Sequence, residues 1–204
     1  MAAIKNIIFD LGGVILNLDF KKAEQAFLDA GMHNFQELFA LGNVKSFFKD
    51  YEIGVIDDSQ FIRELKTATG KEWNDEVLTG AWNAMLGDFP KERIDFLNGL
   101  KNRYRLFLFS NTNALHLKSF RKTYSDNFGN SILDDHFETA YYSHEMKLRK
   151  PEKKAFEYVL EKSGLKAEET LFIDDSLANI EGAREAGLQT IHLKPGMSIL
   201  ELGL

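Results

Sequence analysis

The chain has 204 residues, and its 25 Lys and Arg against 31 Asp and Glu give a formal net charge of −6 at pH 7. This acidic balance argues against a protein that coats nucleic acid, because such proteins neutralise phosphates with an excess of Lys and Arg. The sequence contains no cysteine, which excludes disulfides, thiolate nucleophiles and cysteine-based zinc sites.

The N-terminus begins with Met1 and leads into a short apolar run that Asp10 interrupts. This run is too short for a membrane span or for the apolar region of a signal peptide. We therefore expect a cytoplasmic protein with no membrane partner, either a monomer or a homodimer.

Short apolar runs that end in polar residues predict the strands of a parallel sheet buried on both faces. Helical patterns separate these runs, and glycine follows two of the helices as a stop signal. Strands that alternate with helices of this length predict an α/β fold, a doubly wound (Rossmann-like) parallel sheet with a core formed by 1–16 and 91–204. The expected strands are 6–10, 106–109, 139–143, 170–173 and 190–193, and the expected helices are 91–102, 113–124, 153–163 and 179–186.

The stretch 17–90 has no convincing strand pattern, and helical periods run through most of it. We interpret it as an inserted all-helical cap domain, with crossings at 17–20 and 87–90 that act as hinges. Its aromatic residues are expected to form the cap's own core rather than a ligand site, since aromatic side chains dominate core burial. The expected helices are 21–30, 34–41, 44–53, 58–69 and 75–85, and the aromatic residues are Phe27, Phe35, Phe39, Phe47, Phe48, Tyr51, Phe61, Trp73 and Trp82.

Acidic residues stand at the carboxyl ends of two predicted strands. Asp10 precedes Gly12 and Gly13, which would let a ligand approach the backbone closely, and Asp174 and Asp175 follow another apolar run. For Asp10 the alternative is a strand that ends in an ordinary turn. For the pair it is a helix N-cap, which needs one of the two carboxylates and not both. Because neighbouring carboxylates repel one another unless a cation is present, the pair points to a hard ion such as Mg²⁺.

Two further features suit an anion. Ser110 and Asn111 follow a third strand and precede a helix, so a hydroxyl and exposed backbone amides are available there. Lys150 stands directly before Pro151, which restricts its backbone. Taken alone, Ser110 and Asn111 are equally compatible with capping of that helix, and a lone lysine in a loop is usually solvated.

The order of these features resembles the four-motif pattern of the haloacid dehalogenase superfamily of hydrolases, over nearly the whole chain. The 17–90 insert is similar to the cap of the subgroup whose lid follows the first motif. The matching stretches are Ile7-Ile-Phe-Asp-Leu-Gly-Gly-Val14, Leu108-Phe-Ser-Asn-Thr-Asn113, Arg149-Lys-Pro151 and Phe172-Ile-Asp-Asp-Ser-Leu-Ala-Asn179.

The resemblance implies a magnesium-dependent phosphatase acting on a small phosphorylated metabolite, such as a sugar phosphate. Asp10 would attack phosphorus and form an aspartyl-phosphate that water then hydrolyses. Mg²⁺ would be held by Asp10, the main-chain carbonyl of Gly12 and Asp175, with Asp174 as a neighbour or second ligand.

The resemblance also assigns the groups around the phosphate. Ser110 and the backbone amide of Asn111 would hold its oxygens, and Lys150 would supply positive charge near both the phosphate and the nucleophile. Asn179 would orient the acidic loop.

One position departs from the pattern. Phosphatases of this superfamily usually carry a second aspartate two residues after the nucleophile as general acid, and here that residue is Gly12. An Asp-Leu-Gly branch, similar to sugar-phosphate phosphatases, lacks this acid and is expected to act on good leaving groups such as anomeric phosphates. Asp19 and His116 are candidate substitutes; the alternatives are a hinge residue and a histidine on a helix surface.

Two other functions stay open at this point. A metal-independent 2-haloacid dehalogenase also attacks with an aspartate, but the acidic pair Asp174 and Asp175 speaks against it. A phosphometabolite-binding module with weak or no turnover is compatible with the missing acid.

Overall fold

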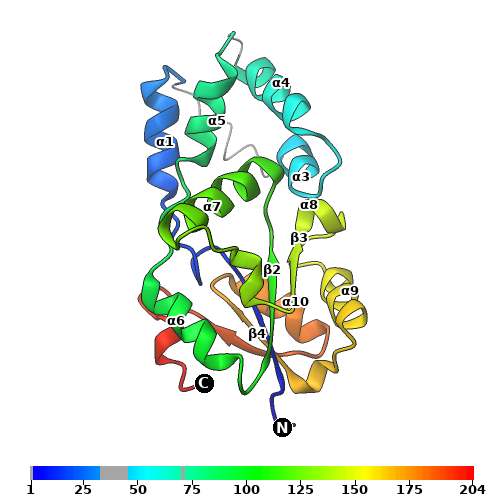
Figure 1. Ribbon diagram of the computed structural model, residues 1–204. Helices are drawn as coiled ribbons and strands as arrows, with labels where there is room; N and C mark the ends of the chain where they lie inside the picture. The colour runs from blue at the N-terminus through cyan, green and yellow to red at the C-terminus, as the bar shows by residue number, and fades with distance from the viewer. Residues whose placement is uncertain (1, 33–45, 70–71) are drawn as a thin grey trace.

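The computed structural model describes residues 2–32, 46–69 and 72–204 (Figure 1). The predicted helix 34–41, with Phe35 and Phe39, lies outside these ranges, as does the beginning of the predicted helix 44–53.

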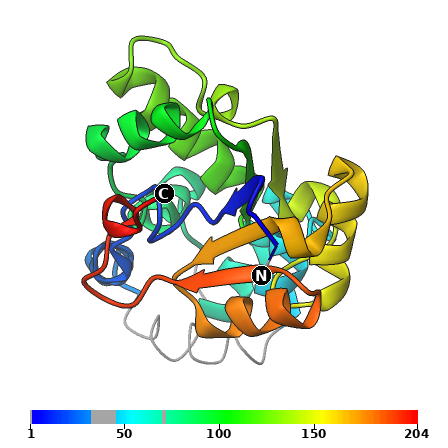
Figure 2. The ribbon, with the colours of Figure 1, turned by 90° about the horizontal axis from the view of Figure 1, so that it is seen from below.

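Five parallel strands form one sheet in the order β3-β2-β1-β4-β5, and Figure 2 shows them from below. All five predicted strands are confirmed, with ends that shift by at most one residue. Their bounds are β1 (Asn6–Phe9), β2 (Arg105–Ser110), β3 (Thr139–Tyr142), β4 (Thr170–Asp174) and β5 (Gln189–His192).

Successive residues of β1 point to opposite faces of the sheet, as the twofold period of a strand requires. Ile7 and Phe9 pack on one face with the helices α6 (Lys91–Leu100) and α7 (Ala114–Asn127). Ile8 packs on the other face with α9 (Lys153–Ser163) and α10 (Leu177–Glu185). Both faces are therefore covered by helices, which confirms the doubly wound sheet.

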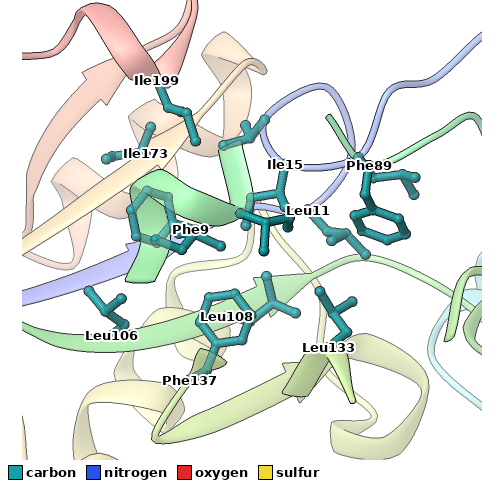
Figure 3. Packing of buried hydrophobic residues seen from close by; sticks show 14 of the residues in the cluster. Phe9, Leu11, Ile15, Phe89, Leu106, Leu108, Leu133, Phe137, Ile173 and Ile199 are labelled. Atoms are coloured by element: carbon teal, nitrogen blue, oxygen red, sulfur yellow. The ribbon is translucent and has the colours of Figure 1, made fainter. Parts of the chain in front are cut away.

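Figure 3 shows the first of these layers, where Phe9, Leu108 and Ile173 from three neighbouring strands meet. Each is fully buried, and burying a side chain of this size contributes about 1.5–3 kcal/mol. This layer fixes the three central strands relative to one another, and with them the residues that follow at their carboxyl ends.

Four helices lie together within the predicted cap, at the top of Figure 1: α1 (Phe20–Asp29), α3 (Ser46–Glu52), α4 (Asp58–Thr69) and α5 (Asp75–Asn83). They share an apolar cluster of their own, centred on fully buried Phe61, which stacks on Tyr51 at a centroid distance of 4.1 Å. The described aromatic residues from the predicted set thus form this core or pack against it, as expected, although Trp82 also lines the cavity described below. The boundaries of the cap at 17 and 90 stay a prediction.

The two chain crossings of the predicted cap are paired with each other. The backbone of Asn17 donates to Asp88 O at 3.0 Å and accepts from Gly87 N at 2.8 Å, and Asp19 N donates to Met85 O at 2.8 Å. A Cβ at Gly87 would lie 2.7 Å from the Asn17 carbonyl oxygen, so only glycine fits here without a shift of the backbone. We name this paired segment the crossing ladder.

The remaining elements are the short helix α8 (Ser143–Met146) and the 3₁₀ turns η1 (Leu133–His136), η2 (Ala167–Glu169) and η3 (Ile199–Glu201). Among the helices within the described ranges, none has both the length and the apolar character that a bilayer crossing needs.

Candidate active site

Three carboxylates meet at the carboxyl edge of the sheet. Asp10 follows β1 and Asp174 ends β4, and the two strands are neighbours, with Asp10 N donating to Ile173 O at 2.9 Å. Asp10, Asp174 and Asp175 each offer one carboxylate oxygen, and these three oxygens lie within 4.8 Å of one another. This distance fits the joint coordination of one ion by oxygens at about 2 Å.

Both glycines after Asp10 lie close to neighbouring side chains, and the backbone conformation of Gly13 favours glycine. Gly13 has a φ of +74°, and a Cβ there would lie 2.3 Å from Asp175 Oδ2. A side chain would therefore both strain the backbone and displace the carboxylate. A Cβ at Gly12 would lie 2.6 Å from Leu18 Cδ1, so the place where a second aspartate would begin is occupied by an apolar side chain.

Lys150 lies between two of these carboxylates. Its Nζ donates to Asp10 Oδ1 and to Asp174 Oδ2, each at 2.7 Å, and the side chain is 1% exposed. Burial alone would favour the neutral amine, but the two carboxylates outweigh it and raise the pKa of Lys150. The ammonium is therefore charged and fixed between them.

The side chain of Asn111 holds this lysine in place. Asn111 Nδ2 donates to Lys150 O and Lys150 N donates to Asn111 Oδ1, both at 2.9 Å. The Lys150–Pro151 peptide bond is cis. Since both ends of the Asn111 amide are used in this way, its backbone is the part left to meet a ligand.

Asp174 and Asp175 differ in what they are free to do. Asp174 is fully buried, and its oxygens accept from Lys150, from Ser176 N at 2.7 Å and from Asn179 Nδ2 at 3.0 and 3.1 Å. Asp175 is exposed toward the cavity described below. The role expected of Asn179, to orient the acidic loop, agrees with these bonds, and Asp175 is the carboxylate of the pair with more room for an ion.

The electrostatics of the cluster fit a divalent cation. Burial raises the pKa of Asp10 to about 7 against the lowering effect of Lys150, and Asp174 adds to the rise. Partial burial and the neighbouring Asp174 also raise the pKa of Asp175. Hard oxygen donors that repel one another are the ligands Mg²⁺ takes, because the cation restores their ionised forms.

A cavity of about 320 Å³ opens beside the carboxylates. Asp10, Ser110 and Asn111 line it from the sheet, while Trp82 and Met85 line it from the predicted cap. Ser110 is 4% exposed and ends β2, the neighbour of β1. The structure thus brings the predicted phosphate-binding residues to the same cavity as the predicted nucleophile.

Asp19 is not among the residues that line this cavity. Its Oδ1 accepts from Lys21 N at 3.1 Å and from Lys22 N at 3.4 Å, and so caps the N-terminus of α1. The structure gives Asp19 a structural role and does not support it as a general acid.

His116 lines the cavity but is not a surface residue, since it is 7% exposed. Its Nδ1 lies 3.2 Å from Asn113 Nδ2, its Nε2 lies 3.1 Å from Trp82 O, and its ring stacks on the Trp82 indole at 4.9 Å. Burial lowers the pKa of His116 to about 4. The ring is therefore neutral near pH 7, with both nitrogens engaged, which argues against it as the acid.

One residue that the sequence pattern did not indicate also lines the cavity. Glu52 ends α3 in the predicted cap, and its Oε1 accepts from Arg149 Nε at 2.6 Å. Its main-chain oxygen accepts from Ser143 Oγ at 2.7 Å. These contacts join segments almost a hundred residues apart, so no local pattern could have revealed them.

The pattern of the family described as "Hydrolase: haloacid dehalogenase-like hydrolase" matches residues 4–187. A D-ribitol-5-phosphate phosphatase from Bacteroides thetaiotaomicron is 30% identical over 193 residues, covering 95% of this chain and 93% of that protein. A glyceraldehyde 3-phosphate phosphatase from Methanocaldococcus jannaschii is 29% identical, covering 95% and 86%. A HAD family enzyme from Bacteroides thetaiotaomicron, crystallised with magnesium and inorganic phosphate, is 36% identical with a TM-score of 0.91, covering 99% and 100%.

Proposed function

Because the chain belongs to the haloacid dehalogenase-like hydrolase family, we propose that it is a magnesium-dependent phosphatase of a small sugar or polyol phosphate. The observation that carries this proposal is the placement of Lys150 Nζ 2.7 Å from both Asp10 and Asp174 in a cluster of three carboxylates. Such a cluster, facing a cavity with Ser110 at its edge, suits an aspartate that must approach an anionic phosphoryl group.

Asp10 attacks phosphorus in the first step, and the bond between phosphorus and the leaving oxygen breaks. Lys150 stabilises the growing negative charge on the phosphoryl oxygens, while Ser110 and the backbone amide of Asn111 donate hydrogen bonds to them. In the second step water attacks the aspartyl-phosphate, phosphate is released and Asp10 is restored.

The carboxylates of Asp10 and Asp175 and the main-chain carbonyl of Gly12 would hold Mg²⁺, with Asp174 beside them. When bound, the ion neutralises charge on the transferring phosphoryl group. Asp174 acts through its bonds to Lys150 and Asn179, which keep the other members of the site in position.

We assign the chemistry to a core of 1–16 and 91–204 and the choice of substrate to a cap of 17–90. The cap contributes apolar residues such as Trp82 and Met85 to the cavity, where the non-phosphate part of the substrate would lie. Curated relatives named as phosphatases of small sugar and polyol phosphates support this substrate class. A metal-independent dehalogenase would have no use for the acidic pair Asp174 and Asp175.

The test is phosphate release from 4-nitrophenyl phosphate and from a panel of sugar and polyol phosphates by the purified protein. Release should require Mg²⁺ and stop in chelator. Asp10→Asn should lower kcat at least about 1,000-fold, because the nucleophile is lost. Asp95→Asn, the same change at an exposed ion pair on α6, should leave the rate unchanged.

Equal rates with Mg²⁺ and in chelator would overturn the metal assignment. Full activity of Asp10→Asn would overturn the assignment of the nucleophile. Chloride release from a 2-haloacid would favour the dehalogenase instead, and no turnover of any compound would favour a binding module.

A further inference from the structure

Hydrolysis of an alkyl phosphate needs a proton for the leaving oxygen, and position 12 offers none. The two substitutes expected from the sequence do not serve, because Asp19 caps α1 outside the cavity and His116 is neutral with both nitrogens engaged. Proton transfer of this kind typically contributes about 100- to 10,000-fold to the rate. Another group that lines the described part of the cavity would have to supply this proton.

Five titratable side chains line the cavity within the described residues, and four of them already have a place. Asp10 is the proposed nucleophile, Lys150 bonds two carboxylates, Asp175 is a proposed magnesium ligand, and His116 is excluded as above. The fifth is Glu52, which ends helix α3 of the proposed cap.

We propose that Glu52 is the general acid and base of this phosphatase, acting on the leaving oxygen in the first step and on water in the second. This inference rests on the proposed function. It places the proton carrier on the cap rather than two residues after the nucleophile, where Leu18 occupies the space.

The contacts of Glu52 suit this role. Ser143 Oγ fixes its main-chain oxygen at 2.7 Å, and Arg149 Nε fixes Oε1 at 2.6 Å. The side chain of Glu52 lines the cavity. Among the described residues, none makes a hydrogen bond to its second carboxyl oxygen, Oε2. That oxygen can therefore meet a substrate oxygen.

The surroundings of Glu52 also allow it to hold a proton. Burial raises the pKa of Glu52, and the positive charges of Arg149, Lys150 and Lys49 oppose this rise without cancelling it. Lys49 also lies 3.7 Å from Glu152. Once the proton has left, the carboxylate that remains is stabilised by Arg149, so the group can cycle between both forms.

The proton and electron movements balance over the two steps. In the first, an Asp10 oxygen bonds to phosphorus, the electron pair of the breaking P–O bond goes to the leaving oxygen, and Glu52 gives that oxygen its proton to form the alcohol. In the second, water bonds to phosphorus, Glu52 takes a proton from that water, and the electron pair of the P–O bond to Asp10 returns to the carboxylate. Glu52 is protonated again at the end.

The experiment compares wild type with Glu52→Gln on substrates that differ in leaving group. Phenyl phosphate and 4-nitrophenyl phosphate lack sugar hydroxyls and differ in how much the leaving oxygen needs a proton; glycerol 3-phosphate needs it most. We expect kcat/KM of the variant to fall about 100- to 10,000-fold on glycerol 3-phosphate. The loss should be smaller on phenyl phosphate and smallest on 4-nitrophenyl phosphate, so the dependence of rate on leaving group becomes steeper.

Glu64→Gln is the matched control, since Glu64 lies on helix α4 of the same cap and does not line the cavity. It should keep the wild-type dependence on leaving group. An equal loss of Glu52→Gln on all three substrates would show a merely structural role and overturn the inference, and so would no loss on any. If wild type released no phosphate in the presence of Mg²⁺, the proposed function itself would fail, which is a different outcome.

Discussion

The ends of the strands and the helices of the segment 17–90 both line the cavity, but buried charges hold the first region together and apolar packing holds the second. At the strand ends, Asp10, Lys150 and Asp174 are buried charges that stabilise one another through bonds of 2.7 Å. In the helical segment, Phe61, Tyr51 and their neighbours form an apolar cluster that has ordinary packing. The difference shows where precise placement is needed: neighbouring strands and the bonds of Asn111 fix the buried charges, while the helices pack together and line the cavity.

Two of the contacts that join these regions use ionisable side chains that line the cavity. His116 on α7 meets the Trp82 carbonyl at the end of α5, and Arg149, next to Lys150, meets Glu52 at the end of α3. We therefore expect substitutions at the strand ends to alter stability through unbalanced charge, and substitutions at these two contacts to alter it through the burial of the side chain.

Lys150→Met is the change with the largest expected effect on stability. It leaves Asp10 and Asp174 buried without their shared cation, and breaking a buried ion pair costs about 3–5 kcal/mol. We expect urea unfolding in chelator to show this loss of unfolding free energy, and Mg²⁺ to restore part of it.

Lys122→Met is the control for that change, because the Lys122–Asp126 pair on α7 is exposed. It should cost less than about 1 kcal/mol. If Lys150→Met were no more costly than the control in chelator, the strand ends would not depend on charge balance in the way described.

His116→Gln tests whether burial holds the His116 ring neutral where the strand ends meet the helical segment. The folded pKa of His116 is about 4, below the ordinary value of 6.5, so the unfolded chain binds more protons between these values. The stability that neutral His116 contributes is present above about pH 6.5 and is lost as the pH falls toward 4. Over this range the free energy of unfolding should fall by about 3 kcal/mol on account of His116.

The glutamine variant lacks this titration. Urea unfolding of both proteins at pH 7 and near pH 4 should therefore show that the difference in their unfolding free energies narrows as pH falls. Other carboxyl groups titrate in both proteins and cancel in the difference. A difference that is constant with pH would mean that His116 is not held neutral by burial.

Asn179→Ala has the smallest expected effect. Asn179 bonds both oxygens of Asp174 without being a proposed ligand, and loss of such an outer partner typically lowers metal affinity about 10- to 100-fold. The Mg²⁺ concentration for half-maximal activity should rise by that factor, and saturating Mg²⁺ should restore most of the rate. Glu181→Ala, on the exposed side of α10, should leave that concentration unchanged.

The sheet and most of the site could be predicted because their signals are local. A buried strand reads as an apolar run, and its polar end marks a carboxyl edge where neighbouring strands bring Asp10, Ser110 and Asp174 together. Even the mixed pattern of 139–143 proved to be a strand. The helical periods within the described part of 17–90 predicted α1, α4 and α5 to within about two residues.

The parts that could not be predicted depend on tertiary contacts. The burial of His116 against Trp82 follows from how α5 packs on α7, and the place of Glu52 in the cavity follows from its contact with Arg149. Neither the burial of His116 nor the position of Glu52 leaves a pattern in the spacing of residues along the sequence. The role of Asp19 as a helix cap was open from sequence, because the same residue type suits a cap and an acid.

The crossing ladder bears on how this protein could change over evolutionary time. Since the chain leaves and rejoins the core at two backbone stretches bonded side by side, the ends of whatever lies between them are already together. The entropy of closing such a loop grows only slowly with its length. Helices can thus be added to or removed from the intervening segment with little effect on the sheet, whereas a change of register at Asn17 or Gly87 would shift the loop that follows Asp10.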